Sequence, residues 1–272
     1  MIKIAFANIK GGVAKTTDTA MLGAGLKKRG YKVLLVDADP QGTLTERSGL
    51  IPESIKENAN GLKYQLLDVF EGTASLKDAI VSTEMGDIVP NSLDMFVADK
   101  RFTGPSSYYL LKNALAEVEN DYDFALIDVL PGAGIMLFNC LVAVDFVTIP
   151  IFASKSSVRG IKLLKDCMDE VKSSKLNENL RVLGFIVNRF NKQAKFSNQI
   201  VDDINKIVAP LLDAELFETK IRNGIALDEC EYKGRSIFFH KPESKVADDF
   251  TRLTEEFLER LDKLTDKSQL QN

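Results

Sequence analysis

The stretch Lys10-Gly11-Gly12-Val13-Ala14-Lys15-Thr16-Thr17 directly follows an apolar run, Ile2 to Ala7, and predicts a phosphate loop between a strand and a helix. Paired glycines let the backbone curl around a phosphate, and the N–H groups that open the following helix point at the anion. Lys15 would bring a positive charge to the terminal phosphates, and Thr16 would reach Mg²⁺ with its hydroxyl. Thr17 would bond the next phosphate inward. We therefore expect this stretch to bind a nucleotide.

A second lysine, Lys10, stands five residues before Lys15 at the end of the predicted strand. There its side chain can point away from its own loop, so we expect it to meet a partner molecule. The usual pattern G-x-x-x-x-G-K-[ST] is only half met, because Ile9 and Ala14 stand where it has glycines. A solvated turn with an incidental lysine is the alternative interpretation of Lys-Gly-Gly. Two acidic segments further along the chain disfavour it.

These two segments are apolar strands that end in carboxylates, Asp37-Ala38-Asp39 after residues 31–36 and Asp128 after residues 123–127. The carboxyl ends of parallel strands lie on the edge of the sheet that carries the phosphate loop. We therefore expect Asp37, Asp39 and Asp128 to converge on Mg²⁺ and the γ-phosphate. Asp37 and Asp128 would act directly or through metal-bound water, and Asp39 would orient or deprotonate the attacking water. Any one of the three could instead be an ordinary strand-end or turn carboxylate.

The motifs resemble those of the deviant Walker ATPases, and among them the partition ATPases called ParA or Soj. The motifs of that family are K-G-G-x-x-K-[ST]-[ST], then D-x-D-P-Q-[GA], then an apolar strand ending in D-x-P-P. Here they correspond to Lys10–Thr17, Asp37–Gly42 and Asp128–Pro131, and the resemblance covers roughly residues 1–262.

The resemblance implies an ATP-dependent homodimer in which Lys10 of one subunit reaches the phosphates bound to the other. It implies that Asp39 positions the hydrolytic water, so that Lys10, Lys15 and Asp39 are the catalytic residues. It also implies that Asn188 reads the edge of the adenine. Three residues depart from the family pattern: Ala14 in place of a common glycine, Leu130 in place of the first proline after Asp128, and Arg222 near a proline that often packs on the base.

Segments with the pattern of strands alternate with segments with the pattern of helices. This alternation predicts an α/β fold of the P-loop NTPase type, a mostly parallel, doubly wound sheet with helices on both faces. No repeat or linker divides the chain, so we expect a single domain over residues 1–272, with a loop at 51–61 and a polar tail from about 266. The expected strands are 3–8, 32–37, 123–128, 144–150, 182–187 and 214–218, and the expected helices are 15–29, 106–119, 157–173, 196–209 and 244–263.

The composition excludes several kinds of site. Cys140, Cys167 and Cys230 form no C-x-x-C pair, which predicts reduced thiols and disfavours iron–sulfur carrier ATPases and nitrogenase iron proteins. The single histidine, His240, makes a histidine-based zinc site or a catalytic triad improbable. No apolar run is long enough to span a membrane, and the C-terminal helix lacks the basic, bulky pattern of a membrane-binding helix such as that of MinD. We expect a cytoplasmic protein that does not bind membranes.

Composition does not decide whether the protein binds DNA. The net charge is −4, but a nonspecific DNA binder needs only local clusters of basic residues. The resemblance implies that the dimer forms a basic surface in the C-terminal region that holds nonspecific DNA in the ATP state. A solvated face of mixed charge is the alternative. The candidate DNA-binding residues are Arg189, Lys192, Lys233, Arg235, Lys241 and Lys245.

Together these expectations describe a slow ATPase that forms an ATP sandwich dimer on nucleoid DNA. A centromere-binding, ParB-like adaptor would stimulate hydrolysis, and a plasmid or chromosome would be the cargo. One alternative is a positioning ATPase of the same type for a protein organelle or cluster. Another is a metabolic P-loop enzyme such as an amide ligase, which would not need Lys10 at a dimer interface.

Overall fold

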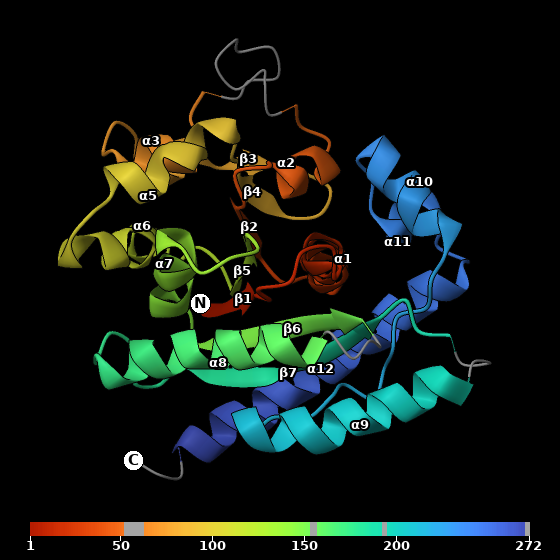
Figure 1. The fold of residues 1–272 in the computed structure, drawn as a ribbon. Coiled ribbons are helices and arrows are strands. Elements are labelled where there is room, and N and C mark those ends of the chain that lie inside the picture. The colour runs from red at the N-terminus through yellow and green to blue at the C-terminus, as the bar shows by residue number, and fades with distance from the viewer. Residues whose placement is uncertain (52–62, 153–156, 192–194, 270–272) are drawn as a thin grey trace.

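The computed structural model describes residues 1–51, 63–152, 157–191 and 195–269. Within these residues seven strands form one sheet in the order β3-β4-β2-β5-β1-β6-β7 (Figure 1). Every neighbouring pair is parallel except β3 with β4. The strands are β1 (Ile2–Phe6), β2 (Val33–Ala38), β3 (Val81–Ser82), β4 (Asp87–Val89), β5 (Phe124–Val129), β6 (Phe146–Phe152) and β7 (Arg181–Asn188).

Helices connect the parallel strands and cover both faces of the sheet, as the fold class requires. In Figure 1, α7 and α1 lie on opposite sides of β1 and β5. The helices are α1 (Lys15–Lys28), α2 (Thr43–Arg47), α3 (Leu66–Phe70), α4 (Leu76–Ala79), α5 (Ala98–Arg101), α6 (Leu110–Ala116), α7 (Ile135–Ala143), α8 (Ser157–Ser173), α9 (Lys195–Leu212), α10 (Ile225–Lys233), α11 (Ile237–His240) and α12 (Lys245–Gln269), with 3₁₀ helices η2 (Leu93–Val97) and η3 (Pro105–Tyr109). The predicted α/β fold with a mostly parallel sheet is confirmed.

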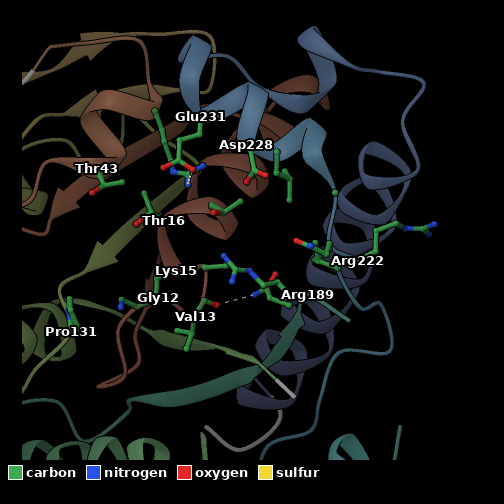
Figure 2. Close-up of a pocket in the computed structure, with 18 of the residues that line it drawn as sticks. Gly12, Val13, Lys15, Thr16, Thr43, Pro131, Arg189, Arg222, Asp228 and Glu231 are labelled. Atoms are coloured by element: carbon green, nitrogen blue, oxygen red, sulfur yellow. Dashed lines mark hydrogen bonds and ion pairs between the residues drawn. The ribbon is translucent and has the colours of Figure 1, made fainter. Parts of the chain in front are cut away.

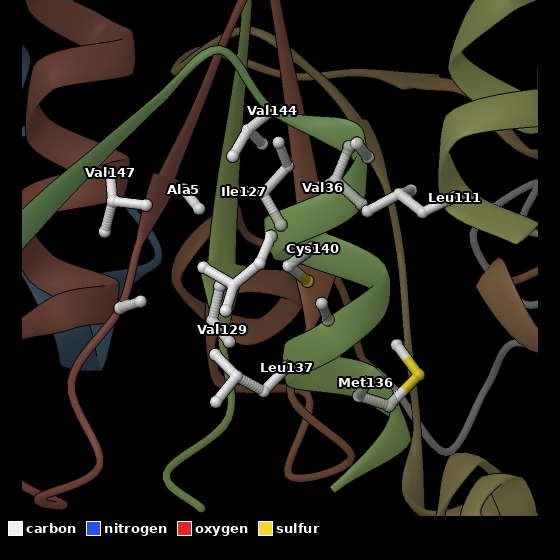
Figure 3. Close-up of a cluster of buried hydrophobic side chains, with 14 of the residues drawn as sticks. Ala5, Val36, Leu111, Ile127, Val129, Met136, Leu137, Cys140, Val144 and Val147 are labelled. Carbon is white, nitrogen blue, oxygen red and sulfur yellow. The ribbon is translucent and has the colours of Figure 1, made fainter. Parts of the chain in front are cut away.

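The sheet separates two hydrophobic cores, because successive residues of a strand point to opposite faces. Ala5 of β1 faces the first core, which α7 and α8 cover, and Ile4 faces the second, which α1 and α12 cover. Figure 3 shows part of the first core, where Leu137 of α7 lies beside Val129 of β5. Each face of the sheet therefore carries its own layer of helices.

The second core joins the beginning of the chain to its end. Phe6 of β1 and Phe250, Phe257 and Leu261 of α12 belong to one buried cluster. The expectation of a single domain over residues 1–272 stays a prediction. Among the described helices, none is both long and apolar enough to cross a bilayer.

Five of the six predicted strands match β1, β2, β5, β6 and β7, with ends that differ by at most two residues. The prediction of a strand at 214–218 is wrong, because Leu216 makes only an isolated parallel bridge to Phe185. The predicted helix 106–119 divides into η3 and α6. Helix α12 continues to Gln269, and the polar tail expected from about 266 stays a prediction. Most of the loop expected at 51–61 lies outside the described residues.

Candidate nucleotide-binding site

A cavity of about 350 Å³ opens where β1, β2 and β7 end at the same edge of the sheet. The phosphate loop forms one wall, with Gly12, Val13 and Lys15 in view in Figure 2, and Asp228 and Glu231 of α10 form the opposite wall. Ligands of open α/β sheets bind at this edge. The cavity therefore lies where the sequence predicts a nucleotide.

The phosphate loop follows β1 and turns into α1 through two residues with positive φ angles. Gly12 has a φ of 69° and Ala14 a φ of 75°, and α1 begins at the next residue, Lys15. An alanine in this region is strained by roughly 1–2 kcal/mol, whereas a glycine is not. Ala14 thus adopts the backbone of the glycine that it replaces, and the loop is formed despite that departure.

Lys15 lies in the cavity wall and is only 6% exposed. Burial lowers the pKa of its ammonium group, while the nearby carboxyls of Asp128 and Asp39 raise it. A lysine held between acids at the start of a helix is suited to bind phosphate oxygens. The structure brings Lys15, Asp39 and Asp128 together as predicted.

Thr16 lines the cavity, and it forms with its hydrogen-bond partner Asp128, which is buried outside the cavity wall, the pair best suited to a magnesium ion. The Thr16 hydroxyl donates a hydrogen bond to Asp128 Oδ2 at 2.6 Å. Within the described residues, Asp128 Oδ1 is buried without a hydrogen-bond partner. A threonine hydroxyl beside a carboxylate with an unused oxygen matches the oxygen ligands that Mg²⁺ prefers. These residues fit the ion.

Asp37 lies beside Asp128, because the register of β2 and β5 pairs the two residues. Its Oδ2 accepts hydrogen bonds from the Thr45 hydroxyl at 2.7 Å and the Thr45 N–H at 2.8 Å. Burial, with a smaller contribution from Asp128, raises the pKa of Asp37 to about 8. Burial also raises the pKa of Asp128 to about 7, against the hydrogen bond from Thr16. Asp37 therefore anchors the beginning of α2 and stands one strand away from the Thr16–Asp128 pair.

Asp39 extends beyond the end of β2 and lines the cavity. Its backbone N–H donates to Asp37 Oδ1 at 3.2 Å, and its own Oδ1 accepts from the Gln41 N–H at 2.9 Å. These bonds hold the turn that presents the carboxylate. Asp39 thus lies in the right place to contact a water in the cavity.

Lys10 does not line this cavity, and neither does Gly11, whereas residues 12–17 all do. The Lys10 N–H donates to Asn8 Oδ1 at 2.9 Å, and Asn8 Nδ2 donates to the Pro150 carbonyl at 2.8 Å. These bonds fix the backbone at the start of the loop. The role of Lys10 toward a second subunit stays a prediction.

Asn188 ends β7 and lines the cavity, where the resemblance places a contact to the adenine. Its Nδ2 donates to Asp18 Oδ2 at 2.6 Å and to the Val13 carbonyl at 3.4 Å. Asp18 is fully buried, and burial raises the pKa of its carboxyl well above the usual range. Asn188 therefore also fixes the phosphate loop and α1 against β7, a role that its position in the sequence does not show.

Asn188→Ala is expected to lower the free energy of unfolding by about 1–3 kcal/mol without any nucleotide, because it leaves the buried Asp18 Oδ2 without its donor. Chemical denaturation followed by circular dichroism measures this change. The control is Asn113→Ala on the exposed face of α6, which should stay within about 0.5 kcal/mol of wild type. Equal stabilities of the two variants would contradict a supporting role for Asn188.

Arg222 also borders the cavity, but α12 holds its guanidinium. Nε donates to Asp249 Oδ2 at 2.6 Å and Nη2 donates to Asp249 Oδ1 at 2.7 Å. In Figure 2 the side chain leaves the cavity toward α12. Arg222 thus fixes the chain segment beside the site through Asp249, and its predicted contact with the base stays a prediction.

The basic residues proposed for DNA fall into different surroundings. Arg189 lines the nucleotide cavity and stacks on Phe152, with 4.7 Å from its guanidinium carbon to the ring centre. Lys192 lies outside the described residues. Arg235 pairs with Glu84 at 2.9 Å, and Lys241 pairs with Glu229 at 3.3 Å. Lys233, at the end of α10, and Lys245, at the start of α12, are exposed.

The residues of the cavity wall that are not among the predicted site residues include Thr43, Arg47, Asp228 and Glu231. Thr43 and Arg47 belong to α2, which directly follows the Asp37–Gly42 motif, so their nearness to the motif is a signal that sequence reasoning could have used. Asp228 and Glu231 have no comparable signal, because α10 reaches the cavity only through the tertiary fold.

Comparison with known proteins places the chain in a family. Residues 1–182 match the family described as AAA domain. The chromosome-partitioning ATPase Soj of Treponema pallidum is 32% identical over 260 residues, which cover 94% of this chain and 97% of that protein.

Two similar solved structures carry nucleotide analogues. Cobyrinic acid a,c-diamide synthase from Mycobacterium smegmatis, with a bound ATP analogue and magnesium, has a TM-score of 0.80 at 27% identity and covers 94% of this chain and 93% of its own. A putative plasmid partition protein from Borrelia burgdorferi bound to AMPPNP has a TM-score of 0.74 at 25% identity, with 96% and 98% covered. With its motifs gathered around one cavity and these likenesses along most of its length, the chain belongs to the ParA/Soj family of partition ATPases within the AAA domain family.

Proposed function

We propose that this chain binds ATP with Mg²⁺ in the cavity described above and hydrolyses it slowly. The observation that carries the proposal is that Lys15, Thr16 and Asp39 line a single cavity at the end of the parallel strands, with Asp128 hydrogen-bonded to Thr16. The ATP analogue and magnesium bound to the Mycobacterium smegmatis enzyme support it.

The protein residues would divide the work of hydrolysis. Lys15 and the N–H groups at the start of α1 hold the phosphates, and Lys10 of the partner subunit adds a second charge from outside. Asp39 orients the attacking water and accepts its proton. Thr16 and Asp128 would hold Mg²⁺, and Asp37 would lie beside Asp128 on the neighbouring strand. The bound ion would offset charge on the phosphate oxygens. Few groups act on the water, so turnover is slow until an adaptor intervenes.

The ATP-bound form would be a sandwich dimer that binds nonspecific DNA and associates with the nucleoid. Dimerisation doubles the number of basic residues on one surface, and affinity for DNA rises steeply with the number of phosphates contacted. A ParB-like, centromere-binding adaptor would stimulate hydrolysis and release the dimer, so that a plasmid or chromosome is partitioned. The name of the Treponema pallidum relative supports this cargo.

An amide ligase is the second candidate, because one of the similar structures is a cobyrinic acid a,c-diamide synthase. Such an enzyme would use ATP to activate a carboxylate and would need no lysine from a second subunit. Lys10→Ala distinguishes the two functions. It should abolish ATP-dependent dimerisation in a partition ATPase and leave an amide ligase dimer or monomer unchanged.

DNA binding is expected only with ATP, and it should weaken as salt rises. Fluorescence anisotropy of a labelled duplex with ATP, with ADP and without nucleotide measures this, and Lys15→Ala is the control that cannot respond to ATP. Replacing Lys233 and Lys245 together by alanine should reduce both the affinity and its dependence on salt, because fewer counterions are released. ATP-driven dimerisation without DNA binding in any state would instead favour a positioning ATPase with a cargo other than DNA.

A further inference from the structure

Arg47 is one of the cationic residues in the wall of the nucleotide cavity, beside Lys15, and it lies at the end of α2. It is only 8% exposed, although an arginine is rarely buried unless it is paired. Its recorded ion pair is with Glu231 of α10, through Nη2. Burial lowers the pKa of the Arg47 guanidinium, while Glu231 and Asp128 raise it. Arg47 is thus a charge that the fold holds inside the cavity wall, close to the metal-site carboxylates.

One donor of this guanidinium is unused. Within the described residues, Arg47 Nε is buried and has no hydrogen-bond partner. A buried donor without an acceptor costs about 1–3 kcal/mol, and a donor on a charged group costs more. Glu231, in contrast, is about half exposed, with 49% of its side chain accessible. Its carboxylate is therefore far more accessible to solvent than the Arg47 side chain, of which 10% is accessible.

Arg47 lies close to the start of α1. Asp18, in the first turn of α1, and Asp128, near the end of β5, both interact electrostatically with the Arg47 guanidinium. The guanidinium therefore lies close to the helix start at which the phosphates are expected. Its planar donors match the oxygens of a phosphate in pairs, which a lysine cannot do.

We infer that Arg47 binds phosphate oxygens of the nucleotide, and that Glu231 holds its guanidinium until the nucleotide arrives. This inference rests on the proposed function, because it requires the nucleotide to occupy this cavity. Arg47 belongs to the helix that follows Asp39 after a short turn, Pro40 to Gly42. A nucleotide bound to Arg47 would therefore contact the same chain segment that carries Asp39, the carboxylate proposed to orient the water.

The test is isothermal titration of wild type, Arg47→Gln and Arg47→Lys with ATP·Mg²⁺ and ADP·Mg²⁺, beside melting curves without nucleotide. Arg47→Gln should weaken the binding of both nucleotides about 10-fold or more, the loss expected for a charge-assisted hydrogen bond. Arg47→Lys should recover part of the affinity, since it keeps the charge and loses the planar fork. Unchanged affinities in Arg47→Gln, with only a lower melting temperature, would overturn the inference and leave Arg47 as a structural residue.

Glu231→Gln and Asp228→Asn form a matched pair, because both remove one negative charge from the same wall of the cavity. Both should tighten nucleotide binding by relieving repulsion, and Glu231→Gln should do so more strongly because it also releases Arg47. In the Arg47→Gln background the two effects should become equal. Equal effects in the wild-type background would overturn the role of Glu231 as a holder.

Lys15→Ala separates this inference from the proposed function. If wild type binds ATP, Lys15→Ala does not, and Arg47→Gln binds as wild type does, the function stands and the inference on Arg47 falls. If wild type and Lys15→Ala both fail to bind ATP, the proposed function falls and the inference falls with it.

Discussion

Lys15→Ala is expected to abolish measurable ATP binding, with a loss of about 100-fold or more. The side chain supplies a positive charge among Asp39 and Asp128 at the start of α1. Without it, a polyphosphate would face these carboxyls with one positive charge fewer at the start of the helix to offset the repulsion. Two or more charge-assisted hydrogen bonds, at about 1.5–3 kcal/mol each, account for the size of the loss.

Titration calorimetry with ATP·Mg²⁺ measures this loss directly. Lys28→Ala is the matched control, because Lys28 lies at the other end of the same helix and stacks on Phe238 away from the cavity. The fold should survive Lys15→Ala, since the substitution removes a buried charge rather than packing. Binding within about threefold of wild type would show that Lys15 does not hold the phosphates.

Asp39→Ala is expected to keep ATP binding and to lower hydrolysis by about 10²–10⁴-fold, the contribution of a positioned general base. Affinity should be kept or increased, because the substitution removes a negative charge from the cavity. With hydrolysis blocked, the protein should accumulate as the ATP-bound dimer. Asp39 lies outside the Thr16–Asp128 pair, so the metal site should remain intact.

Phosphate release and light scattering after size-exclusion chromatography with ATP measure the two halves of this prediction. The control is Asp166→Ala, which removes an exposed carboxylate from α8. Normal turnover in Asp39→Ala would remove Asp39 from the catalytic role. A monomer with bound ATP would instead contradict the sandwich dimer.

The parts of the fold that sequence could predict are those that a short stretch of sequence marks by its own residue types. The glycines of the phosphate loop, the apolar strands and the strand-end carboxylates each have a short sequence signature, and the register that pairs Asp37 with Asp128 follows once the strands are parallel. The antiparallel strand β3 has only two residues and no such signature. Helix α7 is apolar along nearly its whole length because it is buried, so it lacks the one-sided pattern that marks a surface helix.

The contacts of the site that sequence could not predict join distant parts of the chain. Arg47 meets Glu231, which is 184 residues away, and Asn188 meets Asp18, which is 170 residues away. Neither pair has a spacing or periodicity in the sequence from which the contact could be predicted. Leu216 shows the opposite error, since residues 214–218 are apolar enough to predict a strand but pair with β7 only at one bridge.

Two glycines of α1, Gly23 and Gly25, let this helix pack closely against its neighbours on both sides. At Gly23 a methyl group would come within 2.7 Å of the Leu35 side chain, and at Gly25 it would clash with Thr254 of α12. Their absence of a side chain lets α1 lie directly between β2 and α12, with no compressible layer on either side. The helix that begins at the phosphate loop is therefore in direct contact with α12. Any displacement of α1 would have to be accommodated by α12, because no side chain of Gly25 separates the two helices.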